Sequence, residues 1–252
     1  MTPSRDWDAT TYDRVSAPQL DWGREVLDRL SLRGDETVLD AGCGTGRVTA
    51  ELLHRLPRGR VIAVDAAPSM VVKARALLGE RATVLEQDLL GLELPEPVDA
   101  AISTATFHWI GDHDRLFARL HDVLRPGARL SAQFGGEGNI VRFRAAIEAV
   151  AERPEFAACF AGWRRPWHYP SVESTAERLE RAGFEAVHCW LEARPTTPPE
   201  PRAFLASVCV APHLERLPEA LRADFLDELL DQVGEPVELD YVRLNVVAGK
   251  PA

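Results

Sequence analysis

The sequence contains few cysteines and no cysteine pair. Cys43, Cys159, Cys189 and Cys209 are scattered among the 252 residues, with no C-x-x-C motif and no histidine at metal-ligand spacing. The sequence therefore predicts neither a disulfide framework nor a structural zinc site. We therefore expect four reduced thiols and no bound metal.

Long apolar runs and clustered positive charge are also missing. No apolar run is long enough to cross a bilayer, and residues 1–20 lack the apolar core of a secretion signal. The formal net charge is −10, from 29 Lys and Arg against 39 Asp and Glu, whereas phosphate contacts need clustered Lys and Arg. We expect a cytoplasmic protein that binds neither membranes nor nucleic acids.

The stretch VLDAGCGTGRVTAELL, residues 38–53, combines an apolar run, a glycine-rich turn and a helical pattern. The apolar run is typical of a buried parallel strand, and the residues after the turn recur at helical spacing. Gly42, Gly44 and Gly46 give the turn backbone angles that other residues resist, and they let main-chain N–H groups approach a large ligand. The stretch predicts a ligand-binding strand-turn-helix unit.

Strand and helix patterns then alternate along the first half of the chain. Strands are expected at 37–41, 60–66, 82–88, 98–104 and 128–134, and helices at 46–56, 68–78 and 112–124. Alternation with short connections predicts a doubly wound α/β fold, with a mostly parallel sheet and helices on both faces. Two later runs, 185–193 and 239–250, complete the expected seven strands.

The remaining segments lack this alternation. They contain helical patterns, the aromatic and basic loop FAGWRRPWHYP and the proline-rich break PTTPPEP. We expect one domain over 1–252, with a core at about 31–138, 171–192 and 238–250 and a helical cap from 1–30, about 139–170 and 200–234.

Three acids, Asp40, Asp65 and Asp88, end successive expected strands. Asp65 lies 23 residues after Gly42, where a carboxylate can accept hydrogen bonds from two ribose hydroxyls. Open α/β sheets bind ligands beyond the carboxyl ends of their strands, so the acids should meet at one edge and bind a nucleoside. Taken singly, Asp40 or Asp88 could equally be a structural acid at a helix N-terminus.

The loop itself separates two classes of nucleoside ligand. Dinucleotide sites usually read G-x-G-x-x-G, whereas this loop reads G-C-G-T-G and has Asp40 beside it. A carboxylate there would repel a pyrophosphate and would suit a cationic amino-acid tail. The loop therefore favours a nucleoside that carries a cationic amino-acid tail over a nicotinamide or flavin dinucleotide.

The motif series VLDAGCGTGRVTAELL, VIAVDAAPSM, VLEQDLL, DAAISTATFHWI and LRPGARL resembles that of class I S-adenosylmethionine-dependent methyltransferases. The resemblance covers about residues 35–134. More narrowly, DWDATTYDR, FHWIGDHDRLF and LDYVRLNVVAG are similar to trans-aconitate methyltransferase and related small-molecule enzymes.

The resemblance implies S-adenosylmethionine as cofactor and S-adenosylhomocysteine as product. It implies that Asp40 and the glycine loop hold the methionine part and that Asp65 holds the ribose. Asp88 and Leu89 would contact adenine, and Ser103 would lie near the sulfonium. The implied cofactor-binding residues are Tyr12, Asp40, Gly42, Cys43, Gly44, Thr45, Gly46, Asp65, Ala66, Met70, Asp88, Leu89 and Ser103.

His108 follows the fourth expected strand, where the resemblance places the reactive end of the methyl donor. It could accept a substrate proton as a catalytic residue, or it could only line the pocket. The residues expected on the acceptor side are Trp7, Tyr12, His108, Trp109, Phe134, Trp167 and Tyr169. A basic group in the same insertion could bind an acidic acceptor or be solvated surface charge: Arg142, Arg144, Arg164, Arg165 and His168.

The sequence thus predicts methyl transfer to a small-molecule acceptor, a carboxylate or another oxygen or carbon nucleophile. Positioning of the reactants can supply most of the catalysis, so no dedicated catalytic residue is required. The alternatives are a non-methylating protein that binds the same cofactor, such as a cyclase or regulatory module, a nicotinamide-dependent oxidoreductase, and a macromolecule-directed methyltransferase. Monomer and homodimer remain equally open.

Overall fold

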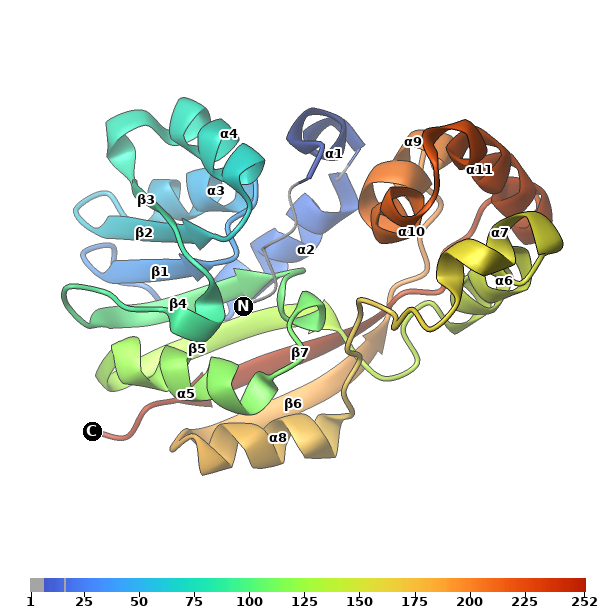
Figure 1. Cartoon of the computed structure of the whole chain (residues 1–252). Helices are drawn as coiled ribbons and strands as arrows, with labels where there is room; N and C mark the ends of the chain where they lie inside the picture. The colour runs from blue at the N-terminus through green and yellow to red at the C-terminus, as the bar shows by residue number, and fades with distance from the viewer. Residues whose placement is uncertain (1–6, 16) are drawn as a thin grey trace.

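The computed structural model describes residues 7–15 and 17–252, which form a central sheet with helices around it (Figure 1). The strands are β1 (Thr37–Ala41), β2 (Arg60–Asp65), β3 (Thr83–Glu86), β4 (Val98–Thr104), β5 (Leu124–Gly135), β6 (Glu185–Ala193) and β7 (Val242–Gly249). Their order is β3-β2-β1-β4-β5-β7-β6, and β7 runs antiparallel to both of its neighbours. The predicted seven-stranded, mostly parallel sheet is confirmed.

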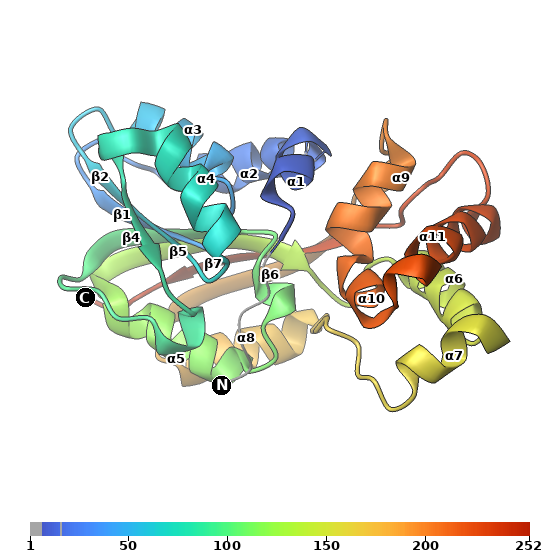
Figure 2. The ribbon, with the colours of Figure 1, turned by 45° about the horizontal axis from the view of Figure 1, so that its top comes forward.

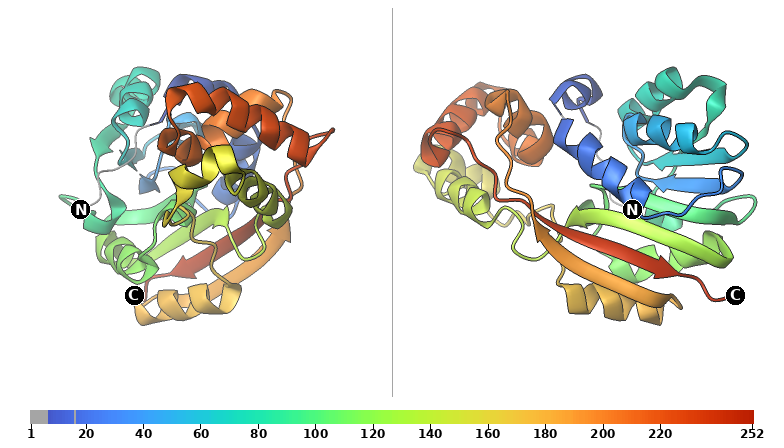
Figure 3. Two further views of the ribbon diagram at one scale, coloured as in Figure 1. Left: turned by 45° about the vertical axis from the view of Figure 1, so that its right-hand side comes forward. Right: turned by 180° about the vertical axis from the view of Figure 1, so that it is seen from behind.

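Helices cover both faces of this sheet and one end of it (Figures 1 and 3). They are α1 (Ala9–Val15), α2 (Ala17–Asp28), α3 (Arg47–Arg55), α4 (Pro68–Leu78), α5 (His113–Val123), α6 (Val141–Ala151), α7 (Pro154–Phe160), α8 (Val172–Arg181), α9 (Pro201–Phe204), α10 (Ala211–Arg216) and α11 (Glu219–Val233). Shorter turns are η1 (Gly79–Arg81), η2 (Leu89–Gly91), η3 (Phe107–Trp109) and η4 (Leu205–Cys209). In the described part of the chain, no helix has the length and apolar character needed to cross a membrane.

Side chains of β1 show how the sheet separates two cores. Val38 packs with Leu27 of α2 and Leu52 of α3 on one face, whereas Leu39 packs with Leu120 of α5 on the other. Successive residues of a strand point to opposite faces, so a strand covered on both sides needs an unbroken apolar run. Each of these fully buried side chains stabilises the fold by about 1.5–3 kcal/mol.

Helix α2 departs from the expectation that residues 1–30 belong to the cap. It packs on the sheet against β4 and β5, with Val26 and Leu27 fully buried, and the Ser131 hydroxyl of β5 donates to the Val26 carbonyl at 3.0 Å. The apolar face of this helix is therefore covered by the sheet. Helix α1, in contrast, lies over the carboxyl ends of the strands, between α4 and the cap helix α9.

The cap consists of α6, α7 and α9 to α11, gathered beyond the carboxyl ends of the parallel strands (Figures 1 and 2). Its core includes Phe143, Phe156, Phe204 and Phe225, all buried. Helix α1 contacts α4 on the sheet side and α9 and η4 on the cap side. The cap, α1 and the strand ends therefore surround a common space.

The segment RPGA, residues 125–128, lies inside β5. The ladder shifts there, because Val98 pairs with Leu124 whereas Ala100 pairs with Arg129. Gly127 has a φ of +78°, which suits a local irregularity. The glycine therefore marks a bulge that lengthens the strand instead of a turn that precedes it.

Candidate functional site

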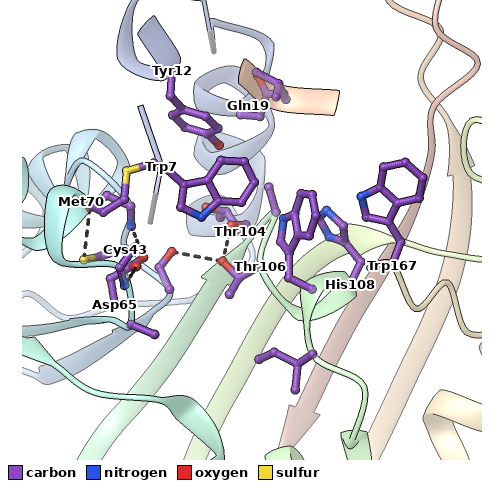
Figure 4. Close-up of a pocket in the computed structure, with 18 of the residues that line it drawn as sticks. Trp7, Tyr12, Gln19, Cys43, Asp65, Met70, Thr104, Thr106, His108 and Trp167 are labelled. Atoms are coloured by element: carbon purple, nitrogen blue, oxygen red, sulfur yellow. Dashed lines mark hydrogen bonds between the residues drawn. The ribbon is translucent and has the colours of Figure 1, made fainter. Parts of the chain in front are cut away.

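A cavity of about 580 Å³ lies between the strand ends, α1 and the cap, with its lining drawn in Figure 4. The loop after β1, the end of β2, the segment after β4 and the cap all contribute to its wall. The predicted residues that line it are Trp7, Tyr12, Gly42, Cys43, Gly44, Thr45, Asp65, Ala66, Met70, Asp88, Leu89, His108, Trp109, Trp167 and Tyr169. The structure thus brings the expected cofactor and acceptor residues around one space.

Four predicted residues lie behind this wall: Asp40, Gly46, Ser103 and Phe134. The Ser103 hydroxyl donates to the Ala41 carbonyl at 2.6 Å, which ties β4 to β1. Phe134 packs against Phe107, with ring centroids 5.3 Å apart, in the core under α5. Strand alternation points Phe134 to the far face of the sheet, so it does not reach an acceptor in the cavity.

Asp40 is fully buried beneath the glycine loop. Its Oδ2 accepts from the Thr49 hydroxyl at 2.7 Å, and its Oδ1 has no partner among the described residues. Burial, with the nearby Asp65 charge, raises the pKa of Asp40 to about 7. Its predicted contact with the methionine part stays a prediction.

The glycine loop is clamped between β2 and the segment after β4. The N–H groups of Gly42 and Cys43 donate to the Val64 carbonyl at 2.8 and 2.9 Å, and the Thr106 hydroxyl donates to the Gly42 carbonyl at 3.1 Å. A Cβ at Gly42 would lie 2.3 Å from Thr106. The loop can approach Thr106 this closely only because residue 42 is glycine.

Asp65 organises the opposite side of the loop. Its Oδ2 accepts from the Gly44 N–H at 2.8 Å and its Oδ1 from the Ala67 N–H at 2.9 Å. Burial raises the pKa of this carboxyl. Each carboxylate oxygen keeps further acceptor capacity toward the cavity, which suits a pair of ligand hydroxyls.

Asp88 combines the structural and the ligand-facing positions that the sequence left open. Its Oδ1 accepts from the Leu90 N–H at 2.9 Å, which caps η2, while the residue also lines the cavity. Leu89 and Met70 add apolar surface to the same wall. This wall can take a flat apolar ring with polar edges.

The N-terminal helix forms a roof over the cavity. Asp13 accepts from the Thr45 hydroxyl through Oδ1 and from Arg47 through its carbonyl, both at 2.8 Å. Trp7 packs edge-on against Trp109 with ring centroids 4.9 Å apart, and Figure 4 shows it over the cavity. The roof is therefore attached to both the glycine loop and the acceptor side.

His108 lies in η3 and is 8% exposed. The Gly135 N–H donates to its Nδ1 at 3.4 Å, which leaves the proton on Nε2. Burial, with a smaller contribution from the Arg243 charge, holds the pKa of His108 well below its ordinary value. The neutral ring, with its N–H on Nε2, can donate a hydrogen bond, and the catalytic role that the sequence offered beside simple pocket lining stays a prediction.

Known proteins match both the sequence and the fold. Residues 38–127 match a family model described as a methyltransferase domain. A trans-aconitate 2-methyltransferase of Deinococcus radiodurans is 29% identical over 97% of this chain and 98% of its own length. One from Escherichia coli O1:K1 / APEC is 34% identical over 51% of this chain, which spans 50% of that relative.

Two solved structures share the architecture. Phosphoethanolamine N-methyltransferase 2 of Haemonchus contortus, with S-adenosylhomocysteine, has a TM-score of 0.66 at 19% identity, over 97% of this chain and 57% of its own. The [4+2]-cyclase SpnF has a TM-score of 0.61 at 20% identity, over 92% and 82%. These matches support a class I S-adenosylmethionine-dependent methyltransferase. This confirms the family and fold that the motif series predicted.

His113 gives the methyltransferase a pH-dependent stability. It is 1% exposed, its Nε2–H donates to the Phe107 carbonyl at 2.9 Å, and burial lowers its pKa to about 4. In the unfolded chain His113 binds a proton near pH 6.5, whereas in the folded chain it stays neutral down to about pH 4. The free energy of unfolding therefore decreases as the pH falls below 6.5. Between pH 8 and 5 the loss should be about 2 kcal/mol from this residue.

Urea unfolding of wild type and His113→Gln at both pH values measures this effect. The variant should lose about 2 kcal/mol less on acidification than wild type. His54→Gln, at an exposed position of α3, is the matched control. An equal loss in wild type and His113→Gln would contradict the assignment.

The methyltransferase cavity also contains residues that sequence reasoning missed. Among them are Gln19, Thr106, Asn139, Tyr241 and Arg243. None of the basic residues first considered for an acidic acceptor lines it: Arg142 pairs with Glu238 at 2.8 Å and Arg165 with Glu148 at 2.9 Å. Residues of the described chain show no group of three or more His, Cys, Asp or Glu side chains that could hold a metal.

Proposed function

We propose that this methyltransferase transfers a methyl group from S-adenosylmethionine to a carboxylate oxygen of a small acid. The observation that carries the proposal is that one roofed cavity contains both the Asp65 wall and the His108 wall. A cavity covered by α1 and the cap suits a small acceptor better than a large polymer. A small acceptor beside a bound nucleoside fits it.

The residues of the first wall fit the cofactor. Asp65 would accept from the ribose hydroxyls, and Asp88 with Leu89 and Met70 would surround the adenine. A Cβ at Gly44 would meet no atom within 4 Å, so the main chain there borders open cavity and would lie along the methionine part. When bound, the cofactor supplies a methyl group on a sulfonium for an in-line displacement.

The acceptor wall fits an acid better than a nucleophile that must lose a proton. An ionised carboxylate needs no base, and neutral His108 can orient it by donating from Nε2 to the carboxylate oxygen that is not methylated. The rings of Trp109 and Tyr169 lie 5.2 and 5.9 Å from that of His108 and exclude water. Holding the reactants in this way can contribute on the order of 7–11 kcal/mol to lowering the barrier.

The names of the relatives support the same acceptor class. Relatives in Deinococcus radiodurans and Escherichia coli are named for trans-aconitate, a tricarboxylic acid. The solved cyclase SpnF shows that a protein of this fold can have another activity. The product must therefore be measured directly.

The test incubates the protein with S-adenosylmethionine and trans-aconitate and follows S-adenosylhomocysteine and the methyl ester by mass spectrometry. Both products should appear in equal amounts, and neither should form when the acid is replaced by its trimethyl ester. Citrate and succinate extend the panel of acids. S-Adenosylmethionine binding without any ester from these acids would refute the proposed acceptor class.

A further inference from the structure

Arg243, on β7, is a buried cation without a counter-ion. It is 2% exposed, and its guanidinium makes no hydrogen bond or ion pair with any residue that the structure describes. Its Nε and Nη2 are buried without a partner. A buried charge left uncompensated destabilises a fold, so such a residue needs a partner from elsewhere.

Aromatic rings hold this guanidinium in place. Its Cζ lies 4.9 Å from the Trp22 ring and 5.9 Å from the Tyr241 ring. Rings at these distances attract a cation and fix its plane, while the N–H groups at the guanidinium edge remain available. A fixed planar fork of donors matches a carboxylate.

Arg243 lies on the acceptor side of the cavity. On β5, Gly135 pairs with Arg243, and the Gly135 N–H also donates to His108. The other charged lining residues lie on the cofactor side: Arg47, whose Nη1 donates to the Asp13 carbonyl, and the acids Asp65 and Asp88. The cavity is therefore acidic where a cationic cofactor fits and basic at the opposite wall.

Burial lowers the pKa of Arg243 to about 10, so the group stays protonated at neutral pH. The tyrosines around it, Tyr12, Tyr169 and Tyr241, have raised pKa values because they are buried. They are neutral at that pH and do not balance the charge. An anionic ligand would balance it.

We propose that Arg243 binds a carboxylate of the acceptor that is not methylated, which makes the acceptor a di- or tricarboxylate. This inference rests on the proposed function. A carboxylate held by a guanidinium fork has its oxygens engaged and is a poor nucleophile. A second carboxylate of the same molecule can then lie free at His108 and Trp109, where the methyl group is expected.

The experiment is calorimetric titration of the S-adenosylhomocysteine-loaded protein with trans-aconitate, succinate and acetate. Wild type should bind the tricarboxylate and the dicarboxylate, and acetate at least tenfold more weakly. Arg243→Gln should weaken trans-aconitate binding roughly 100-fold, with Arg243→Lys between the two. Arg58→Gln, an exposed arginine before β2, is the control and should bind as wild type does.

Two further measurements, S-adenosylhomocysteine binding and the unfolding temperature, distinguish a wrong proposed function from a wrong role for Arg243. Absence of S-adenosylhomocysteine binding to wild type would refute the proposed function itself. Normal S-adenosylhomocysteine binding with equal trans-aconitate affinity in wild type and Arg243→Gln, or with no acid bound by wild type, would overturn the role of Arg243. Without ligand, Arg243→Gln should unfold at or above the wild-type temperature, because it removes an unpaired buried charge. A clearly lower temperature would assign Arg243 a structural role instead.

Discussion

Replacing Asp65 with alanine should weaken the binding of S-adenosylhomocysteine roughly 100-fold or more. The proposed ribose contacts are hydrogen bonds to an ionised acceptor, and each contributes about 1.5–3 kcal/mol. The change also releases the N–H groups of Gly44 and Ala67, which donate to Asp65 at 2.8 and 2.9 Å. Calorimetric titration measures the affinity directly.

Two further variants serve as a graded comparison and a control for Asp65→Ala. Asp65→Asn keeps the shape but loses the charge, so its affinity should fall between those of wild type and Asp65→Ala. Asp122→Ala removes an exposed carboxylate from α5, far from the cavity lining, and should leave the affinity unchanged. A folded Asp65→Ala protein with wild-type affinity would remove the ribose assignment.

Replacing Gly42 with alanine should destabilise the fold by about 2–5 kcal/mol and disrupt the glycine loop. The new Cβ would lie 2.3 Å from both Cγ2 and Oγ1 of Thr106, at a residue whose φ is +83°. Overpacking of this kind costs about 1–3 kcal/mol, and the left-handed backbone adds roughly 1–2 kcal/mol. Urea unfolding gives the stability, and cofactor titration shows the damage to the loop.

Gly79→Ala separates the contribution of backbone strain from that of overpacking against Thr106. Gly79 also has a positive φ, +57°, but a Cβ there would meet no atom within 4 Å. Gly79→Ala should lose roughly 1–2 kcal/mol from backbone strain alone. If both variants lose the same amount, the close approach of Thr106 has no energetic weight.

Features set by local sequence could be predicted well. β1 and β4 occupy the predicted residues, 37–41 and 98–104, because a doubly covered strand needs an apolar run whatever its neighbours are. The glycine loop and Asp65 were identified because their spacing along one strand-turn-helix unit fixes their position. Asp65 consequently reaches the cavity in the structure.

Features that depend on packing between distant segments could not be predicted from the sequence. Arg243 stands in an alternating strand, where an arginine usually points to solvent, and nothing nearby in the sequence shows that Trp22 covers it. Phe134 lies one residue before the end of its strand, and its position in the alternation directs it into the core. Short helices such as α1 and α7 offer too few residues for a periodic pattern.

The place of β7 in the sheet has a consequence for how the chain is made. β7 is the last strand in the sequence, yet it lies between β5 and β6 (Figure 3). A growing polypeptide that has not reached Val242 can pair β1 to β5, but β6 lacks β7, the strand with which it pairs. Because synthesis proceeds from the N-terminus, the sheet stays divided until its final residues emerge, and Arg243 arrives with the strand that joins the two parts.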